Sequence, residues 1–145
     1  MLIDVILACA RAKLAVVAAD ERDGGRRQVL NLGHTVGHAL EVSLGYGTLR
    51  HGEAVGLGLL AALRLSGLGE LRDRVEALLG DAGLPTRLEG HDVDPEAIIA
   101  ATRLDKKRTT TARTPFVLVR EAGDVVHGQD VADDDVVAAV RELTS

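Results

Sequence analysis

The sequence predicts a mainly α-helical, multi-helix domain with a small C-terminal β-hairpin. Its 145 residues are enough for one domain with a hydrophobic core. Hydrophobic residues make up 46% of the chain, but the only aromatic side chains are one Tyr and one Phe. The core must therefore be built from Leu, Val, Ile and Ala, which suits closely packed helices. An all-β fold is disfavoured.

Apolar residues at helical spacing predict the helices, and glycine, proline and aspartate mark their ends. The second helix should stop at Gly45-Tyr46-Gly47. The fifth opens at Asp94-Pro95-Glu96, where Asp caps and Pro fits the first turn. The expected helices span residues 2–18, 26–44, 52–67, 71–80, a segment from Asp94 onward, and 134–143.

The hairpin is predicted by two short β-branched runs, TPFVLV and GDVVHG, which are joined by Glu-Ala-Gly-Asp at 121–124. After it, three aspartates at 133–135 suit the positive end of the last helix, and we interpret them as a helix cap rather than a cation site. Gly52, Gly56 and Gly58 each cost the third helix about 1 kcal/mol relative to alanine. We therefore expect another backbone or a ligand to approach that helix closely, at the centre of the domain.

Charge and cysteine content exclude several classes of protein. The formal net charge is -5, with no long run of Lys or Arg, so a nucleic-acid partner is not expected. The single cysteine, Cys9, excludes an internal disulfide, and its apolar neighbours predict that it is buried. Asp4, Arg11 and Lys13 interrupt the apolar N-terminal stretch, which predicts neither a membrane span nor a signal peptide. We expect a cytoplasmic protein.

Polar residues in the second expected helix recur on one face. Counted at about 100° per residue, they fall within roughly 80° of arc. They are Arg27, Asn31, His34, His38 and Glu41. A solvated helix face would account for such a stripe. Solvated faces more often carry Lys and Glu, however, so a binding function is the favoured interpretation.

His34 on this stripe and His51 at the start of the third helix could meet after the turn at 45–47. Imidazole is the commonest side-chain ligand of zinc, and a catalytic zinc takes three protein ligands. The spacing of residues alone does not identify the third ligand. The HExxH and CxxC signatures are absent, and Glu41 or Glu53 could supply an oxygen. A core or surface role for His51 also stays open, while His91 and His127 are interpreted as surface residues.

Three blocks of the sequence together resemble one enzyme family. The run KLAVVAADERDGGRRQVLNLGHTVGHALEVSLGYGTLRHGEAV, residues 13–55, is similar to the C-terminal half of 3-dehydroquinate synthases, with the blocks KAxVVxxDExExGxR, LNxGHTxGHAxE and HGEAV in order. Gly83-Leu84-Pro85-Thr86, Asp105-Lys106-Lys107 and Phe116-Val117-Leu118 also match. The family usually has an arginine before the last of these, where this chain has Pro115.

The resemblance implies roles for individual residues. His34 and His51 would bind zinc, or another divalent ion such as cobalt, and the third ligand would be a glutamate of an upstream segment that these residues lack. Catalytic or substrate-binding roles are implied for Lys13, Arg27, Asn31 and His38, and substrate binding for Lys106 or Lys107. Such cations suit a small sugar acid that carries phosphate and carboxylate groups.

The implied reaction converts 3-deoxy-arabino-heptulosonate 7-phosphate to 3-dehydroquinate and phosphate in the shikimate pathway. It needs NAD, which the family binds in an N-terminal α/β domain with no counterpart in residues 1–145, where GxGxxG is also absent. We therefore expect no cofactor-binding residues for NAD here, and an inactive chain unless an NAD-binding part is supplied in cis or in trans. A homodimer is compatible with this. Two alternatives stay open: a fragment of another metal-dependent sugar-phosphate cyclase or polyol dehydrogenase, and a truncated, non-catalytic binding module.

Overall fold

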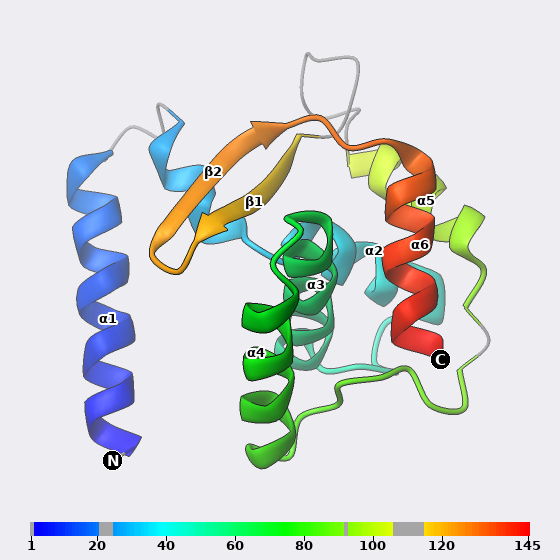
Figure 1. Ribbon diagram of the computed structural model, residues 1–145, viewed down its shortest axis with the longest axis horizontal. Helices are drawn as coiled ribbons and strands as arrows, with labels where there is room; N and C mark the ends of the chain where they lie inside the picture. The colour runs from blue at the N-terminus through cyan, green and yellow to red at the C-terminus, as the bar shows by residue number, and fades with distance from the viewer. Residues whose placement is uncertain (1, 21–24, 92, 106–114) are drawn as a thin grey trace.

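Two packed helices at the centre of the molecule, α2 (His34–Leu44) and α3 (His51–Leu65), organise the fold. The computed structural model describes residues 2–20, 25–91, 93–105 and 115–145 (Figure 1). Helices α4 (Gly69–Asp81) and α6 (Asp133–Thr144) pack on α3, and α5 (Pro95–Asp105) packs on both α2 and α6. The mainly helical architecture predicted from the sequence is confirmed.

Helix α3 contributes most to the core, in agreement with its predicted central place, but of its glycines at 52, 56 and 58 only Gly58 is approached closely by another backbone. The helix buries eight of its 15 residues. The largest fully buried side chains of the core come from α2, α3, α5 and α6, and all are aliphatic: Leu40, Leu57, Leu60, Leu63, Ile98, Val136, Val140 and Leu143. The fold therefore rests on aliphatic packing between helices, because burial of such side chains is the main favourable contribution to folding.

The predicted hairpin is present. Strands β1 (Phe116–Glu121) and β2 (Asp124–Gln129) pair antiparallel, with Leu118 opposite Val126 and irregular register at both ends. Gly123 adopts a φ of 94° in the connecting turn, a conformation that favours glycine. The backbone N–H of Val119 donates to the hydroxyl of Ser66 over 3.0 Å, which ties the hairpin to the end of α3.

The expected helix over 26–44 is wrong in one respect, because two separate helices occupy this stretch. Residues Arg26–Asn31 form a 3₁₀ helix, η1, and α2 begins only at His34. Between them, Leu32 is extended and Gly33 is left-handed, with a φ of 80°. A Cβ on Gly33 would lie 2.8 Å from the backbone of Val55 and Leu59 in α3. The helix is interrupted at Gly33, where the backbone packs directly against the backbone of α3.

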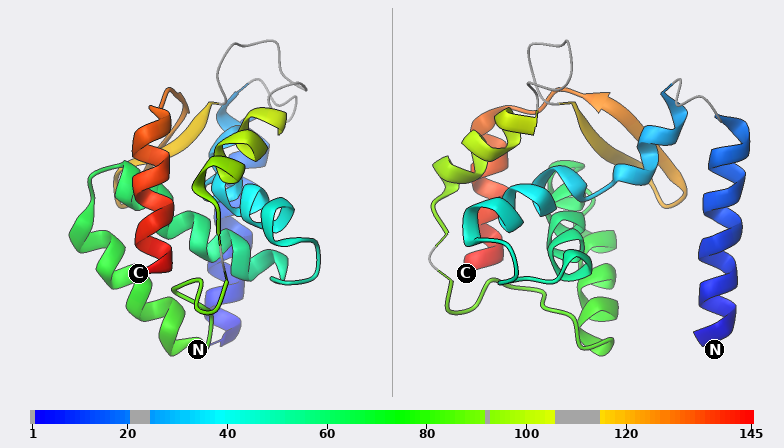
Figure 2. Two further views of the ribbon diagram at one scale, coloured as in Figure 1. Left: turned by 90° about the vertical axis from the view of Figure 1, so that its right-hand side faces the viewer. Right: turned by 180° about the vertical axis from the view of Figure 1, so that it is seen from behind.

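Helix α1 (Leu2–Ala19) lies at one end of the molecule, with η1 and the hairpin between it and the other helices (Figures 1 and 2). It packs chiefly on η1 and buries none of its residues. Leu2 and Ile3 are 74% and 70% exposed. The prediction that Cys9 is buried is wrong: its thiol is exposed, because no described element covers that face of α1. Within the described part of the chain, every helix is too short or too polar to cross a bilayer.

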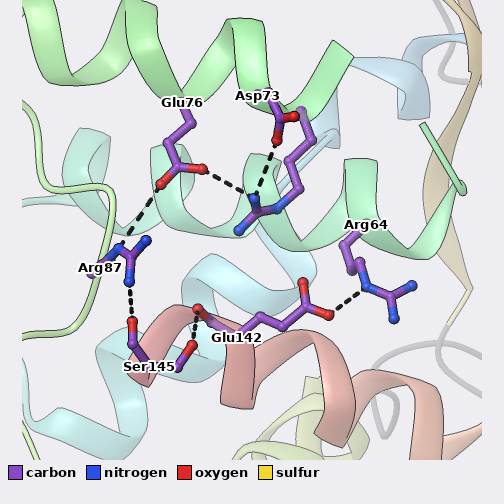
Figure 3. Close-up of polar contacts among 7 residues, drawn as sticks. Arg64, Asp73, Glu76, Arg87, Glu142 and Ser145 are labelled. Carbon is purple, nitrogen blue, oxygen red and sulfur yellow. Dashed lines mark hydrogen bonds and ion pairs between the residues drawn. The ribbon is translucent and has the colours of Figure 1, made fainter. Parts of the chain in front are cut away.

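Polar contacts join α3, α4 and α6 at the surface (Figure 3). Arg64 donates to Glu142 over 2.6 Å, and Arg87 donates to the carbonyl oxygen of Ser145 and lies 4.0 Å from Glu76. The hydrogen bond and the charge of Glu142 raise the pKa of Arg64 above its ordinary value. Exposed pairs of this kind contribute little stability, so the packing of the helices rests on their aliphatic core.

Candidate metal centre

Three imidazoles meet where α2 and α3 begin to run side by side. His34 is the first residue of α2, His38 lies one turn later, and His51 is the first residue of α3. The ring centroids are 5.3 Å apart for His34 and His38, 5.4 Å for His34 and His51, and 5.6 Å for His38 and His51. One ring nitrogen of each lies within 4.8 Å of the others. The predicted convergence of His34 and His51 is present in the structure, and His38 joins them.

Glycines bring the two helices close enough for this. A Cβ on Gly37 would lie 2.9 Å from the carbonyl oxygen of Ala54. A Cβ on Gly58 would overlap the carbonyl oxygen of Gly33 and lie 2.8 Å from the amide nitrogen of Gly37. Only glycine fits such contacts between backbones. The turn after α2, with positive φ at Gly45 and Gly47, then returns the chain so that His51 faces the first turns of α2.

Hydrogen bonds fix two of the three rings. Nδ1 of His34 lies 3.2 Å from the carbonyl oxygen of Leu32, and Nδ1 of His51 lies 3.3 Å from a carboxylate oxygen of Glu41. Because both oxygens act as acceptors, a neutral ring in either position would carry its proton on Nδ1 and have its lone pair on Nε2. Among the described residues, His38 has no such partner. The structure therefore distinguishes His34 and His51, whose rings are anchored, from His38.

These donors fit a divalent transition-metal ion. Neutral imidazole nitrogens suit zinc and cobalt, and metal-bound histidines usually donate their other ring N–H to a carbonyl or carboxylate oxygen, as His34 and His51 do here. His38 and His51 are exposed and His34 is partly buried, so solvent or a substrate can reach the cluster from outside. Catalytic metal sites, unlike structural ones, are open to substrate in this way.

The other residues of the predicted site are distributed unevenly. Arg27 and Asn31 are exposed on η1, so they do not share a helix face with the histidines, contrary to the stripe interpretation. Lys13 is exposed on α1, which packs chiefly on η1. Lys106 and Lys107 lie outside the described residues. The structure thus assembles the histidines and Glu41, and leaves the roles of the cationic residues as predictions.

The two glutamates considered as oxygen ligands behave differently. The carboxylate of Glu53 accepts from the backbone N–H of Arg50 over 2.8 Å and closes a capping box at the start of α3. Glu41 instead contacts His51, a contact that sequence reasoning missed. The available signal was its position three residues after His38 and seven after His34, which places it on the same face of α2.

Together, the fold and the cluster define a helical domain with three histidines whose spacing could hold a metal ion. The family model described as 3-dehydroquinate synthase C-terminal matches residues 1–108. The chain belongs to the 3-dehydroquinate synthase family. It is 46% identical over 149 residues to the 3-dehydroquinate synthase of Rhodospirillum rubrum and 42% identical over 148 residues to that of Nostoc sp. strain PCC 7120.

The alignments cover 96% and 98% of this chain but only 38% and 40% of those two relatives. The chain therefore spans about two fifths of the length of the curated proteins it matches. The fold is also similar to part of 2-deoxy-scyllo-inosose synthase, as seen in its crystal structure complexed with carbaglucose-6-phosphate, NAD⁺ and Co²⁺. That likeness has a TM-score of 0.70 at 22% identity and covers 94% of this chain and 39% of the other.

Proposed function

We propose that this chain is the metal- and substrate-binding part of a 3-dehydroquinate synthase, which converts 3-deoxy-arabino-heptulosonate 7-phosphate to 3-dehydroquinate and phosphate in the shikimate pathway. The observation that carries the proposal is the three-imidazole cluster, with its two anchored rings, in a chain of this family. The single cysteine agrees with a cytoplasmic location.

His34 and His51 are the proposed metal ligands, through the Nε2 atoms that their anchored Nδ1 atoms leave free. The ion, zinc or cobalt, would act as a Lewis acid toward a substrate oxygen. The 2-deoxy-scyllo-inosose synthase of similar fold was crystallised in complex with Co²⁺, which supports a divalent ion. A third protein ligand would come from a preceding segment of the enzyme, as the family resemblance implies.

His38 is the proposed proton carrier. Its ring lies within 5.6 Å of both anchored imidazoles, but no described group fixes its tautomer, so either nitrogen is free to accept or donate a proton. Arg27, Asn31 and Lys13, with Lys106 or Lys107, are proposed to bind the phosphate and carboxylate groups of the substrate. An arginine can hold either group through two parallel hydrogen bonds.

The enzyme also needs NAD, and we propose that an NAD-binding part acts with this chain in cis or in trans. The decisive experiment mixes the chain with a separately expressed NAD-binding half of a family member and measures phosphate release. We expect activity from the mixture and none from either part. His34→Ala should abolish the activity, whereas His127→Ala, an exposed histidine of the hairpin, should not change it.

The outcome also separates this proposal from the related cyclases. Phosphate release from a different sugar phosphate, but not from 3-deoxy-arabino-heptulosonate 7-phosphate, would assign the chain to another sugar-phosphate cyclase. A folded, NAD-bound complex of the two parts that releases no phosphate from any of these substrates would contradict the enzyme assignment. It would support a non-catalytic binding module instead.

A further inference from the structure

The carboxylate of Glu41 contacts an exposed imidazole of the cluster, that of His51. The side chain of His51 is 59% exposed, so packing does little to fix its ring, whereas the side chain of Glu41 is only 15% exposed. Its two oxygens lie 3.4 Å and 3.3 Å from Nδ1 of the same ring. A mostly buried carboxylate thus reaches from α2 to the first residue of α3.

This contact determines which nitrogen of His51 can bind an ion. Nδ1 must carry a proton to bond with the carboxylate, and the lone pair then resides on Nε2. Without Glu41 the exposed ring would be free to rotate and to exchange tautomers. Ordering the ring beforehand also lowers the conformational entropy that metal binding would otherwise cost.

We infer that Glu41 is a positioning residue for the metal site, acting on the ion through His51 rather than by direct coordination. Among the described residues, the group with metal-ligand spacing consists of the three histidines and does not include Glu41. The hydrogen-bonded outer partners of metal ligands typically contribute 10- to 100-fold to metal affinity. The inference rests on the proposed metal site. The experiment below distinguishes a failure of the inference from a failure of the metal site.

The test is a titration of the purified chain with Co²⁺, followed by calorimetry and by the visible absorption of the bound ion. We expect Glu41→Ala to weaken binding by about 10- to 100-fold. Glu41→Gln should stay within a few fold of the parent, because its amide oxygen still accepts from Nδ1–H. Glu89→Gln, which removes the same charge from an exposed loop residue, serves as the matched control.

Two further measurements exclude a merely structural effect. In a double-mutant cycle, Glu41→Ala should cost no additional affinity once His51 is alanine, since the carboxylate acts through that ring. In the metal-free chain, nitrogen-15 NMR of the histidines should show His51 as the Nδ1–H tautomer, and Glu41→Ala should shift it toward a mixture. Circular dichroism verifies that each variant is folded.

The results separate the possible failures. If the parent chain binds Co²⁺ and Glu41→Ala binds it equally well, the inference is overturned and the proposed metal site survives. If Glu41→Gln loses as much affinity as Glu41→Ala, the carboxylate is itself a ligand, and the positioning role is wrong. If the folded parent chain binds no Co²⁺, the metal site fails, and the inference that rests on it fails as well.

Discussion

At the scale of single residues, the contact of Gly58 with Gly33 and Gly37 is the tightest constraint on the helix pair that carries the histidines. We expect Gly58→Ala to destabilise the chain by about 1 to 3 kcal/mol, because the added methyl group would overlap the Gly33 carbonyl oxygen. The rigid backbones on both sides leave little room for relaxation. Urea unfolding monitored by circular dichroism measures this.

Gly56→Ala is the matched control, two residues away in the same helix. A Cβ there would meet only Leu79, at an ordinary 3.6 Å, so the change should be neutral or stabilising by up to about 1 kcal/mol through helix propensity. Equal effects of the two substitutions would show that backbone contact does not limit the approach of α2 to α3.

Sequence reasoning reached part of the cluster at this scale. The turn glycines and the helix start at residue 51 were sufficient to predict that His34 and His51 meet. The contact between Glu41 and His51 was missed: the spacing places Glu41 on the face of His34 and His38, but its choice of partner depends on side-chain orientations across two helices. The metal-binding and catalytic roles of these residues stay predictions.

At the scale of elements, α1 is stabilised differently from α3 and α6, which carry much of the core. It has no buried residue and packs chiefly on η1, whereas α6, which is shorter, buries four residues. In proteins most of the stability of a helix comes from tertiary packing of its apolar face, and α1 has little of it. We therefore expect the amides of α1 to exchange with solvent much faster than those of α3 and α6, measured by hydrogen exchange with mass spectrometry.

The measurement should be repeated at two protein concentrations. Fast exchange at both would agree with an uncovered helix. Protection of α1 equal to that of α6, at low as well as high concentration, would contradict the expectation and mean that its packing on η1 suffices.

Element boundaries were predictable where the determining residues are close in sequence. Asp94 caps α5 as expected, with its side chain accepting from the backbone N–H of Glu96 over 2.9 Å, and the hairpin turn is where its glycine predicts. The break at Gly33 was missed because its cause, the backbone of α3, lies more than 20 residues away in the sequence. The burial of Cys9 was predicted wrongly because burial depends on neighbours in space, and α1 has few of them.

At the scale of the whole molecule, an ion bound by His34 and His51 should link α2 to α3 and stabilise the folded state. A ligand that binds only the folded state adds about 2.7 kcal/mol of stability when its free concentration is about 100 times its Kd. For a chain of this size, that corresponds to a rise of roughly 5 to 10 °C in Tm. Thermal unfolding with and without Co²⁺ measures the shift.

His34→Ala and His51→Ala should each remove the shift, and His127→Ala should retain it. A shift of the same size in all three variants would indicate binding elsewhere on the surface and would contradict the assignment of these ligands.

The glycine contact between α2 and α3 has a consequence for how this family can diverge. Main-chain atoms are in direct contact where the two helices cross, so the separation at that point depends less on the choice of aliphatic core residues than on the glycines. Interior side chains can therefore differ between family members, at some expense in thermal stability, while the close approach of α2 to α3 at Gly58 is kept.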